Sequence, residues 1–290
     1  MSKHALSLGQ CASLACLLEV SIPKPGNVHR GADFEDVTFY HFAAAAAVIA
    51  PAIDQAPGRG VGETVLDAVS LTRRLVATNT NLGTLLLIAP LAGVPRDVPL
   101  AEGLPGVLAT LDATDARCIY EAIRLAQAGG LGKVAEADVA NAPPADLVAA
   151  MRLAADRDLV ARQYVNDFAE VLGSVVPWLA DAMARDLGLV QAVRAAQLRL
   201  LAAFPDSLIA RKCGLPTAEQ ASALAQAALA AGPPGSEAHE EVVAELDFWL
   251  RSDGHRRNPG TTADLLAAGL FAALRDGIIE LPLTFLPPIA

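Results

Sequence analysis

Apolar residues recur at helical spacing along most of the chain, and short segments rich in glycine and proline separate the periodic stretches. The alternation of β-branched and polar residues that marks half-buried strands is scarce. The sequence therefore predicts an all-α protein. The expected helices cover residues 5–20, 37–54, 63–77, 80–91, 112–128, 145–172, 175–188, 190–203, 216–231, 237–252 and 261–277.

Loops are expected where glycines and prolines gather, because these residues do not continue a helix. Pro51 and Pro177 are expected at kinks or in first turns. No loop is long or polar enough to be a clear linker, so we expect one multi-helix domain over residues 1–290, with a polar pocket formed by interhelical loops. The expected loops are 23–36, 92–106, 129–144 and 232–236.

Composition supports packed helices and argues against a membrane span. Hydrophobic residues make up 53% of the chain but aromatic residues only 4%, and the apolar residues are mostly Ala and Leu, which favour helices. The most apolar stretch, 82–94, is interrupted by Gly83, Pro90 and Gly93 and is shorter than the roughly 20 residues that cross a bilayer. We therefore expect a soluble protein with no membrane partner.

Four cysteines lie far apart, without a Cys-x-x-Cys pair or metal-ligand spacing to the five histidines. Reduced thiols and a cytoplasmic location are expected. The apolar run after Lys3 resembles a secretory leader, but Gln10 and Glu19 fit an amphipathic first helix better.

The chain is acidic, with 22 basic and 32 acidic side chains and a formal charge of −10. Such a balance predicts no nucleic-acid partner. If the ligand is itself anionic, local basic residues, helix N-termini or a bridging divalent cation must receive it.

The first polar cluster follows the first expected helix. Glu19 lies near the end of that helix, and the loop 23–30 reads Pro-Lys-Pro-Gly-Asn-Val-His-Arg. Its prolines stiffen it, its glycine lets a ligand approach the backbone, and its three basic residues concentrate positive charge. The pattern predicts an anion-binding loop, and a solvated turn is the alternative.

Two further clusters carry carboxylates and amides. Asp33, Glu35 and Asp36 are oxygen ligands of the kind that Mg²⁺ uses, although such residues also cap helices, which we favour for Asp36. The amides of the Asn79-Thr80-Asn81-Leu82-Gly83 segment lie between apolar runs, where they either cap buried helix ends or line a site.

Acidic residues also occur in the middle of the chain. Asp112 and Asp115 share a helix face, upstream of a Gly129-Gly130-Leu131-Gly132 run that is either a helix C-cap or a site. Asp158 and Arg162 are spaced for a surface ion pair.

Two clusters belong to the last third of the chain. One places Asp206 and Ser207 just before Arg211 and Lys212. The other, residues 258–264, resembles a capping box with Thr261 as N-cap and Asp264 three residues on. Such a helix start can also hold a phosphate.

The order of these clusters resembles the triphosphoribosyl-dephospho-CoA synthase family over most of the chain. The resemblance rests on Glu19 with Pro23-Lys24-Pro25-Gly26, on Asn79-Thr80-x-x-Gly83, on Asp115 to Gly132, on Asp158 to Tyr164, on Asp206 to Gly214 and on Pro259-Gly260 with Ala263-Asp264-Leu265-Leu266.

The resemblance implies an all-helical transferase that joins ATP to 3′-dephospho-CoA and releases adenine. Such pentosyl transfer needs an acid for the leaving base and carboxylates near an oxocarbenium-like centre. Mg²⁺ is expected with the ATP triphosphate. The residues expected to act in catalysis are Glu19, Asp115, Asp158 and Asp264, and the expected metal ligands are Asp33, Glu35 and Asp36. The residues expected to bind substrate are Lys24, Pro25, Gly26, Asn27, His29, Arg30, Asn79, Thr80, Asn81, Gly83, Gly130, Arg162, Asp206, Ser207, Arg211, Lys212, Pro259, Gly260 and Thr261.

Two departures from the family pattern bear on the substrate. Where the family reads Asn-Thr-His-Lys-Gly, this chain has Asn81 and Leu82, so a cation near the phosphates is missing. The family's Gly-Ser-His-x-Asp-Met element is replaced by residues 31–36. These changes indicate a divergent member, whose acceptor is 3′-dephospho-CoA or a related coenzyme.

Three other functions stay open at this point: a Mg²⁺-dependent hydrolase of a ribosyl or nucleotide bond, a related transferase in the biosynthesis of another coenzyme, and a non-catalytic helical module. The expected partners are ATP and a nucleotide-type coenzyme acceptor, and a homodimer is an option.

Overall fold

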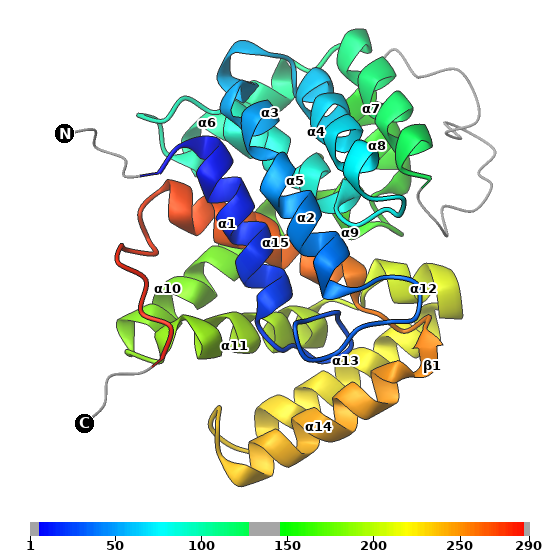
Figure 1. Ribbon diagram of the computed structural model, residues 1–290, viewed down its shortest axis with the longest axis vertical. Coiled ribbons are helices and arrows are strands. Elements are labelled where there is room, and N and C mark those ends of the chain that lie inside the picture. The colour runs from blue at the N-terminus through cyan, green and yellow to red at the C-terminus, as the bar shows by residue number, and fades with distance from the viewer. Residues whose placement is uncertain (1–5, 128–145, 287–290) are drawn as a thin grey trace.

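Helix α15 (Gly260–Arg275) runs through the centre of the protein, buried along nearly its whole length, in the computed structural model shown in Figure 1. Its sequence is apolar on all faces, as a helix enclosed by other helices requires. Helices α1 (Leu8–Ser21), α5 (Leu82–Gly93), α10 (Val176–Ala184) and α11 (Gly188–Ala203) pack against it. The structure describes residues 6–127 and 146–286.

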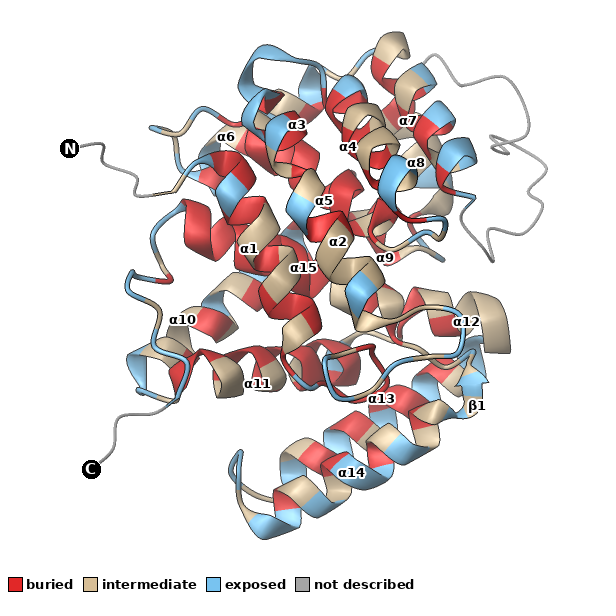
Figure 2. Ribbon diagram, viewed as in Figure 1, coloured by how far each residue is buried: buried red, intermediate tan, exposed pale blue. Residues whose placement is uncertain are grey.

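The remaining helices cover this central group. Figure 2 shows buried residues on their inner faces and exposed residues on their outer faces. The all-α prediction is confirmed, and the one extended segment among the described residues is β1 (Ser252–His255). The covering helices are α2 (Phe39–Val48), α3 (Ala50–Asp54), α4 (Val61–Leu75), α6 (Leu100–Ala109), α7 (Ala113–Ala126), α8 (Leu147–Ala154), α9 (Leu159–Gln163), α12 (Ser207–Cys213), α13 (Leu215–Ala230) and α14 (Glu237–Arg251), with a 3₁₀ turn at Ala56–Gly58.

Two hydrophobic clusters meet along α11. Leu189 and Leu200 belong to the larger cluster around α15 and α5. Leu198 and Leu201, on the opposite side of α11, belong to a smaller cluster formed with α12, α13 and α14. The helix therefore forms a wall that is shared by both clusters.

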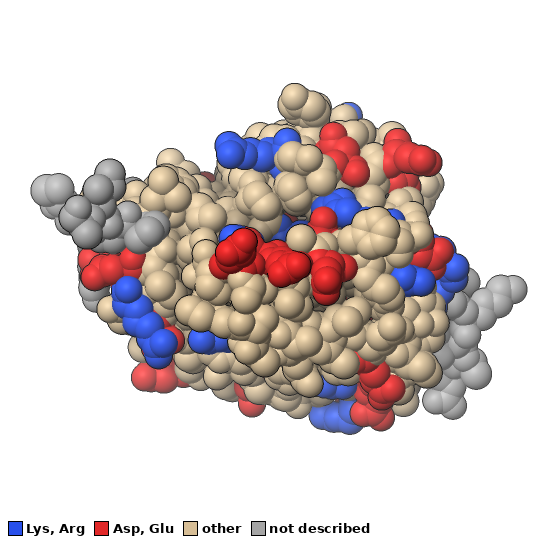
Figure 3. All heavy atoms as spheres, turned by 90° about the horizontal axis from the view of Figure 1, so that it is seen from below, with Lys and Arg blue, Asp and Glu red and all other residues tan. Residues whose placement is uncertain are grey.

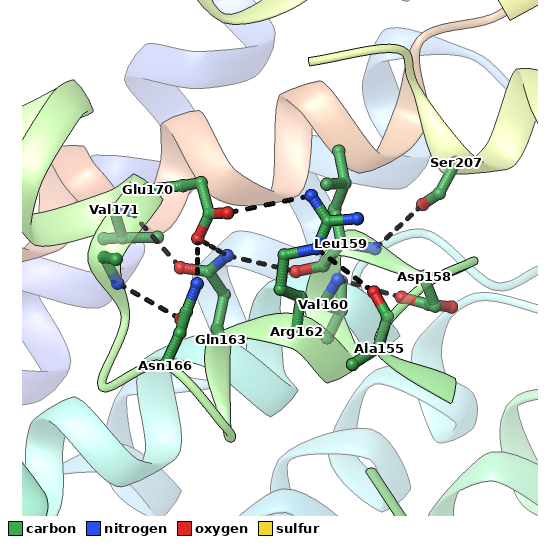
Figure 4. A network of polar contacts seen from close by, with 11 residues as sticks. Ala155, Asp158, Leu159, Val160, Arg162, Gln163, Asn166, Glu170, Val171 and Ser207 are labelled. Carbon is green, nitrogen blue, oxygen red and sulfur yellow. Dashed lines mark hydrogen bonds and ion pairs between the residues drawn. The ribbon is translucent and has the colours of Figure 1, made fainter. Parts of the chain in front are cut away.

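The predicted helix over 145–172 is wrong, because the chain breaks twice within the described part of that range. Asp158 caps a new helix, α9, by accepting hydrogen bonds from the N–H groups of Val160 and Ala161. After α9, the buried carboxylate of Glu170 accepts hydrogen bonds at 2.7 Å from the side chains of Gln163 and Asn166 (Figure 4). A single π-helical turn, Val171–Val175, then leads into α10.

Two helices form where none was expected. Helix α6 lies partly within the predicted loop 92–106, because Leu100, Leu104 and Leu108 share one buried face and outweigh Pro105. Helix α12 is short and was missed because its pattern spans only two turns. Pro51 and Pro177 lie in the first turns of α3 and α10, as predicted.

The described segments contain no helix that is both long and apolar enough to cross a membrane. Figure 3 shows acidic and basic side chains interspersed with uncharged surface on the face it presents, without a large basic patch.

Candidate active site

Side chains from α1, α5, α7, α8, α9, α12, β1 and α15 line a cavity of about 640 Å³. This volume falls in the range of sites for small molecules and cofactors. Helices α7 and α8 contribute apolar side chains such as Ile119 and Met151. Charged and polar side chains come from α12, from α15 and from Asp158, the N-cap of α9. A ligand with an apolar part and an anionic part matches this lining.

Asp264 is the most perturbed acid of the cavity. It lies on α15, and Thr84 Oγ1 donates a hydrogen bond to its Oδ1 at 2.7 Å. Burial raises the pKa of Asp264 to about 7, and the nearby negative charges of Glu19, Asp206 and Asp158 act in the same direction, while the Thr84 hydrogen bond opposes them. A carboxyl group that titrates near neutrality is suited to donate a proton.

Gly83 lies against the same carboxyl group. A Cβ atom at position 83 would overlap Oδ2 of Asp264. The close approach of α5 and α15 at this point therefore requires glycine.

Glu19 is the second carboxylate of the cavity, and it is held by an ion pair. Lys24 Nζ lies 3.0 Å from Glu19 Oε1, and the Lys24 side chain is fully buried. The same ammonium group donates hydrogen bonds to the backbone carbonyls of Glu19 and Ile22 at the end of α1. Lys24 therefore serves as a counter-ion and helix cap, and it is not among the residues that line the cavity.

A third charged group joins α9 to α12. Arg211 forms an ion pair with Asp158, and both side chains line the cavity. Lys212, Arg157 and His255 also line it. Burial is the main cause that lowers the pKa of Lys212. Arg211, Lys212 and Arg157 provide the positive charge that an anionic ligand needs in an acidic protein.

The family model for ATP:dephospho-CoA triphosphoribosyl transferase matches residues 5–281 of the chain. The chain belongs to this family. A crystal structure of an Archaeoglobus fulgidus protein assigned as a triphosphoribosyl-dephospho-CoA synthase is similar, with 30% sequence identity and a TM-score of 0.62. That match covers 81% of this chain and 98% of the other. Among curated proteins, none matches significantly.

The amide cluster of this triphosphoribosyl transferase family member both caps a helix and lines the cavity, so the two alternatives hold together. Asn79 Oδ1 accepts a hydrogen bond from the Leu82 N–H at 3.2 Å, at the start of α5. Asn81 donates to Thr72 Oγ1 at 3.4 Å. Thr80 Oγ1 is buried and has no hydrogen-bond partner among the described residues. All three line the cavity together with Gly83.

The loop after α1 is fixed by residues that its sequence does not reveal. Asp247 on α14 accepts a hydrogen bond from the Gly26 N–H at 2.7 Å and another from Arg251 Nε at 2.8 Å. Arg251 also donates to the Asn27 carbonyl, and its guanidinium group lies 5.4 Å from the centre of the Phe34 ring. Asn27 and Phe34 line the cavity, so α14 shapes one of its walls.

The rest of this loop faces elsewhere. Among the described residues that line the cavity, Pro25, Gly26, His29 and Arg30 do not occur. Arg30 is exposed, and burial is the main cause that lowers the pKa of His29. The loop as a whole therefore lacks the geometry of the expected anion-binding loop.

The expected metal ligands do not come together. Asp33 accepts a hydrogen bond from the Phe39 N–H at 2.6 Å, Asp36 lies 3.2 Å from His255 Nδ1, and Glu35 is exposed. Within the ranges 6–127 and 146–286, no group of three or more His, Cys, Asp or Glu side chains could hold a metal ion. These residues therefore do not fit a resident Mg²⁺ site.

Asp115 has the contacts of a helix cap. Its Oδ1 accepts a hydrogen bond from the Gly62 N–H at 2.7 Å, and its Oδ2 accepts one from the Asp112 N–H at 3.0 Å. It lies outside the cavity lining and joins α4 to α7. We assign it no catalytic role.

Arg162 also lies outside the cavity lining. Its Nε donates to the Ala155 carbonyl at 3.1 Å, and its guanidinium group lies 3.9 Å from Glu170 (Figure 4). The expected ion pair with Asp158 is replaced by Arg211, which approaches Asp158 from another helix. Gly130 and the glycine run around it lie outside the described residues.

The predicted capping box at the start of α15 does not form. Pro259 is the N-cap, and its side chain accepts no capping hydrogen bond, while Asp264 faces Thr84. Gly260 and Thr261 line the cavity, but the N–H of Thr262 is bound by Asp206 at 2.7 Å. Asp206, Ser207 and Pro259 are not lining residues. The start of α15 is therefore capped from inside the protein.

Several lining residues were missed by the sequence analysis. Arg157 and His255 carried no motif, and Asn258 was not among the expected substrate ligands, although Asn27 Nδ2 donates a hydrogen bond to its Oδ1 at 2.9 Å across a sequence separation of 231 residues. Ile119 and Met151 follow an ordinary apolar pattern. For these two, a position in the core and a position in a cavity produce the same sequence signal.

Proposed function

We propose that the protein transfers the triphosphoribosyl group of ATP to the 2′-hydroxyl of 3′-dephospho-CoA, or of a closely related coenzyme, with release of adenine. The observation that carries this proposal is one cavity with two carboxyl groups in different surroundings. Asp264 is buried beside a hydroxyl group, whereas Glu19 has a buried ammonium group as its partner. Two carboxyl groups in such different surroundings can act as general acid and general base in the same site.

Asp264 is the proposed general acid. When the bond between C1′ of the ATP ribose and N9 of adenine breaks, the electron pair of that bond goes to N9 of adenine. A proton from the Asp264 carboxyl group then lets adenine leave as a neutral molecule. The pKa of about 7 keeps a substantial fraction of Asp264 protonated near neutral pH.

Glu19 is the proposed general base. The new bond forms between C1′ and the acceptor oxygen, and Glu19 takes the hydroxyl proton while its charge stabilises the oxocarbenium-like centre. The proton that Glu19 gains and the proton that Asp264 loses balance over one turnover. The ion pair with Lys24 supplies the counter-charge that an ionised buried carboxylate needs.

Arg211, Lys212 and Arg157 are proposed to receive the phosphates. They line the cavity on the side of α9 and α12. Since the residues present do not fit a resident Mg²⁺ site, any divalent cation is expected to enter with the triphosphate as part of the substrate. We derive no step of the reaction from it.

The free cysteines Cys11, Cys16, Cys118 and Cys213 support a proposed cytoplasmic location, because reducing compartments keep thiols unpaired. A homodimer stays a prediction that sedimentation analysis of the purified protein tests.

The experiment that tests the proposed function measures adenine release from ATP and Mg²⁺ by chromatography, with and without 3′-dephospho-CoA. Release that requires the acceptor, together with a product of the summed mass less adenine, is the expected result. Adenine from ATP alone would indicate the hydrolase. Nucleotide binding by calorimetry without adenine release would indicate another acceptor, and absence of binding would contradict an ATP donor.

A further inference from the structure

Asp206 forms a buried junction between two helices. Its side chain is fully buried, and Oδ1 accepts hydrogen bonds from the N–H groups of Leu208 and Ile209 at 2.9 and 3.0 Å. Its Oδ2 accepts hydrogen bonds from both N–H and Oγ1–H of Thr262 at 2.7 and 2.8 Å. One carboxylate therefore caps α12 and also binds the first turn of α15.

Ser207 extends this junction to a third helix. Its hydroxyl accepts a hydrogen bond from the Leu159 N–H at 3.2 Å, as Figure 4 shows, and donates one to Thr261 Oγ1 at 3.0 Å. Two consecutive residues thus connect the N-terminal ends of α9, α12 and α15.

An ionisable group faces the cavity from each of the three helices or from its N-cap. Asp158 caps α9, Arg211 lies on α12, and Asp264 lies on α15. Arg211 also forms an ion pair with Asp158. The junction and this ion pair therefore connect Arg211, which is proposed to bind phosphate, with Asp264, the proposed general acid.

The chemistry of the junction requires a carboxylate. Every partner of Asp206 is a hydrogen-bond donor, and an amide in its place would turn an NH₂ group toward one of them. A buried charge is costly even when hydrogen-bonded, and apolar residues often stabilise a fold equally well. A role in holding the three helices in place would account for the free-energy cost of burying this charge.

We propose that Asp206 is a positioning residue, which holds Arg211 on α12 and Asp264 on α15 in the relative placement that transfer requires. The inference rests on the proposed function. Asp206 acts through Thr262 and through its cap on α12, and it does not touch the substrate.

The charge of Asp206 has a second effect that can be measured. The groups that act on Asp264 are Glu19 from α1, Thr84 from α5, Asp158 from α9 and Asp206 itself, with Lys24 and Arg211 paired to two of these carboxylates. Removing the Asp206 charge is expected to lower the pKa of Asp264. This shift reports the charge of Asp206 whatever its role in geometry, so kcat is the readout of positioning.

The test compares Asp206→Asn with Asp115→Asn, a matched control. Asp115 is also a buried carboxylate that accepts backbone N–H groups at a helix start, but it lies outside the cavity. The measurements are the melting temperature, kcat and KM for adenine release, and the titration of the Asp264 carboxyl carbon by ¹³C NMR, assigned with Asp264→Asn.

The expected result is a kcat about 10- to 100-fold lower for Asp206→Asn, since small misplacements of reacting groups carry losses of this size. The Asp264 titration should move to lower pH. For Asp115→Asn, the melting temperature should fall, while kcat and the titration of Asp264 stay unchanged. The proposal is overturned if Asp206→Asn keeps its kcat, whatever its melting temperature and its titration.

A second pair of variants separates geometry from charge and serves if Asp206→Asn does not fold. Thr262→Val removes only the hydroxyl donor, and Thr262→Ser keeps it. A several-fold lower kcat for Val with near-normal activity for Ser supports positioning, and equal kcat for both contradicts it.

A failure of the proposed function is recognised separately. If the wild-type protein releases no adenine with the acceptor, the transferase proposal fails, and ATP affinity replaces kcat as the readout. Asp206→Asn should then weaken ATP binding, and an unchanged affinity would overturn the positioning role.

Discussion

Lys24 Nζ lies 3.0 Å from Glu19 Oε1, in a buried pair beside the cavity that also contains Asp264. Asp264 has a hydroxyl group as its hydrogen-bond partner, and no described cation pairs with it within 4 Å. The two carboxyl groups therefore differ in the form that their surroundings favour. This difference is the physical basis for assigning the acid and the base of the proposed transfer.

Replacing Asp264 by Asn should reduce kcat about 10²- to 10⁴-fold, the usual contribution of a general acid. In the wild-type protein, kcat/KM should fall as pH rises through about 7, because Asp264 loses its proton there. The pH profile of adenine release measures this limb.

The variant Thr84→Val is the control for that assignment. The Thr84 hydrogen bond lowers the pKa of Asp264, so its removal should move the limb to higher pH. A limb that stays in place in Thr84→Val, or persists in Asp264→Asn, would assign the acid to another group.

Asp264 should also make the folded state less stable as pH rises. An unperturbed Asp titrates near 4 and the folded Asp264 near 7, so between these values the folded state holds one proton more than the unfolded state. The free energy of unfolding should therefore fall across this window and level off above it. Urea titrations at pH 5 and pH 8 measure the fall, which should be smaller in Asp264→Asn. An equal fall in the free energy of unfolding between pH 5 and pH 8 in both proteins would contradict the raised pKa of Asp264.

Substituting Gly83 by Ala should impair both folding and activity. Alanine normally stabilises a helix relative to glycine by roughly 0.5–1 kcal/mol. Here the added Cβ would overlap the Asp264 carboxyl group, so we expect a lower melting temperature and a kcat reduced about tenfold or more.

Gly106→Ala in α6 is the matched control, because a Cβ at that position meets nothing within 4 Å. It should keep full activity and melt at the same or a higher temperature. If Gly83→Ala behaves in the same way, the close approach of α5 and α15 is not a constraint on the site.

Replacing Lys24 by Met should destabilise the protein by about 3–5 kcal/mol, the usual result when one partner of a buried ion pair is removed. The change also removes the donor to two carbonyls at the end of α1. Urea unfolding measures the loss. Arg59→Met provides the comparison, since its pair with Asp67 at 2.7 Å is partly exposed and should contribute only about 0–1 kcal/mol. Similar losses of stability in both variants would show that the buried Lys24–Glu19 pair contributes no more than the partly exposed pair.

Local patterns in the sequence determined most of the helices. Ala- and Leu-rich periodicity predicted α1, α4, α5, α7, α11, α13, α14 and α15. Helix boundaries failed where side chains capped a break, as at Asp158, because a cap and an ordinary surface aspartate look alike in a sequence.

The sequence predicted several residues of the candidate site correctly, but it predicted the contacts of those residues less well. The sequence marked Glu19, Asp158, Asp264 and Arg211, and all four line the cavity. It also marked Asp115 and the Asp33 to Asp36 carboxylates, which lie outside the cavity or do not cluster. Their residue types suit both a helix cap and an active site, so type alone does not separate the two.

Only the tertiary structure decided the partners. Asp158 pairs with Arg211 and not with Arg162, Asp264 meets Thr84 across 180 positions, and Asp206 caps α15 from the start of α12. Helical periodicity specifies which face of a helix is buried, but not which other helix that face meets. The protonation of Asp264 depends on burial and on charges brought from three other segments, so its chemistry was determined by packing and not by its local sequence.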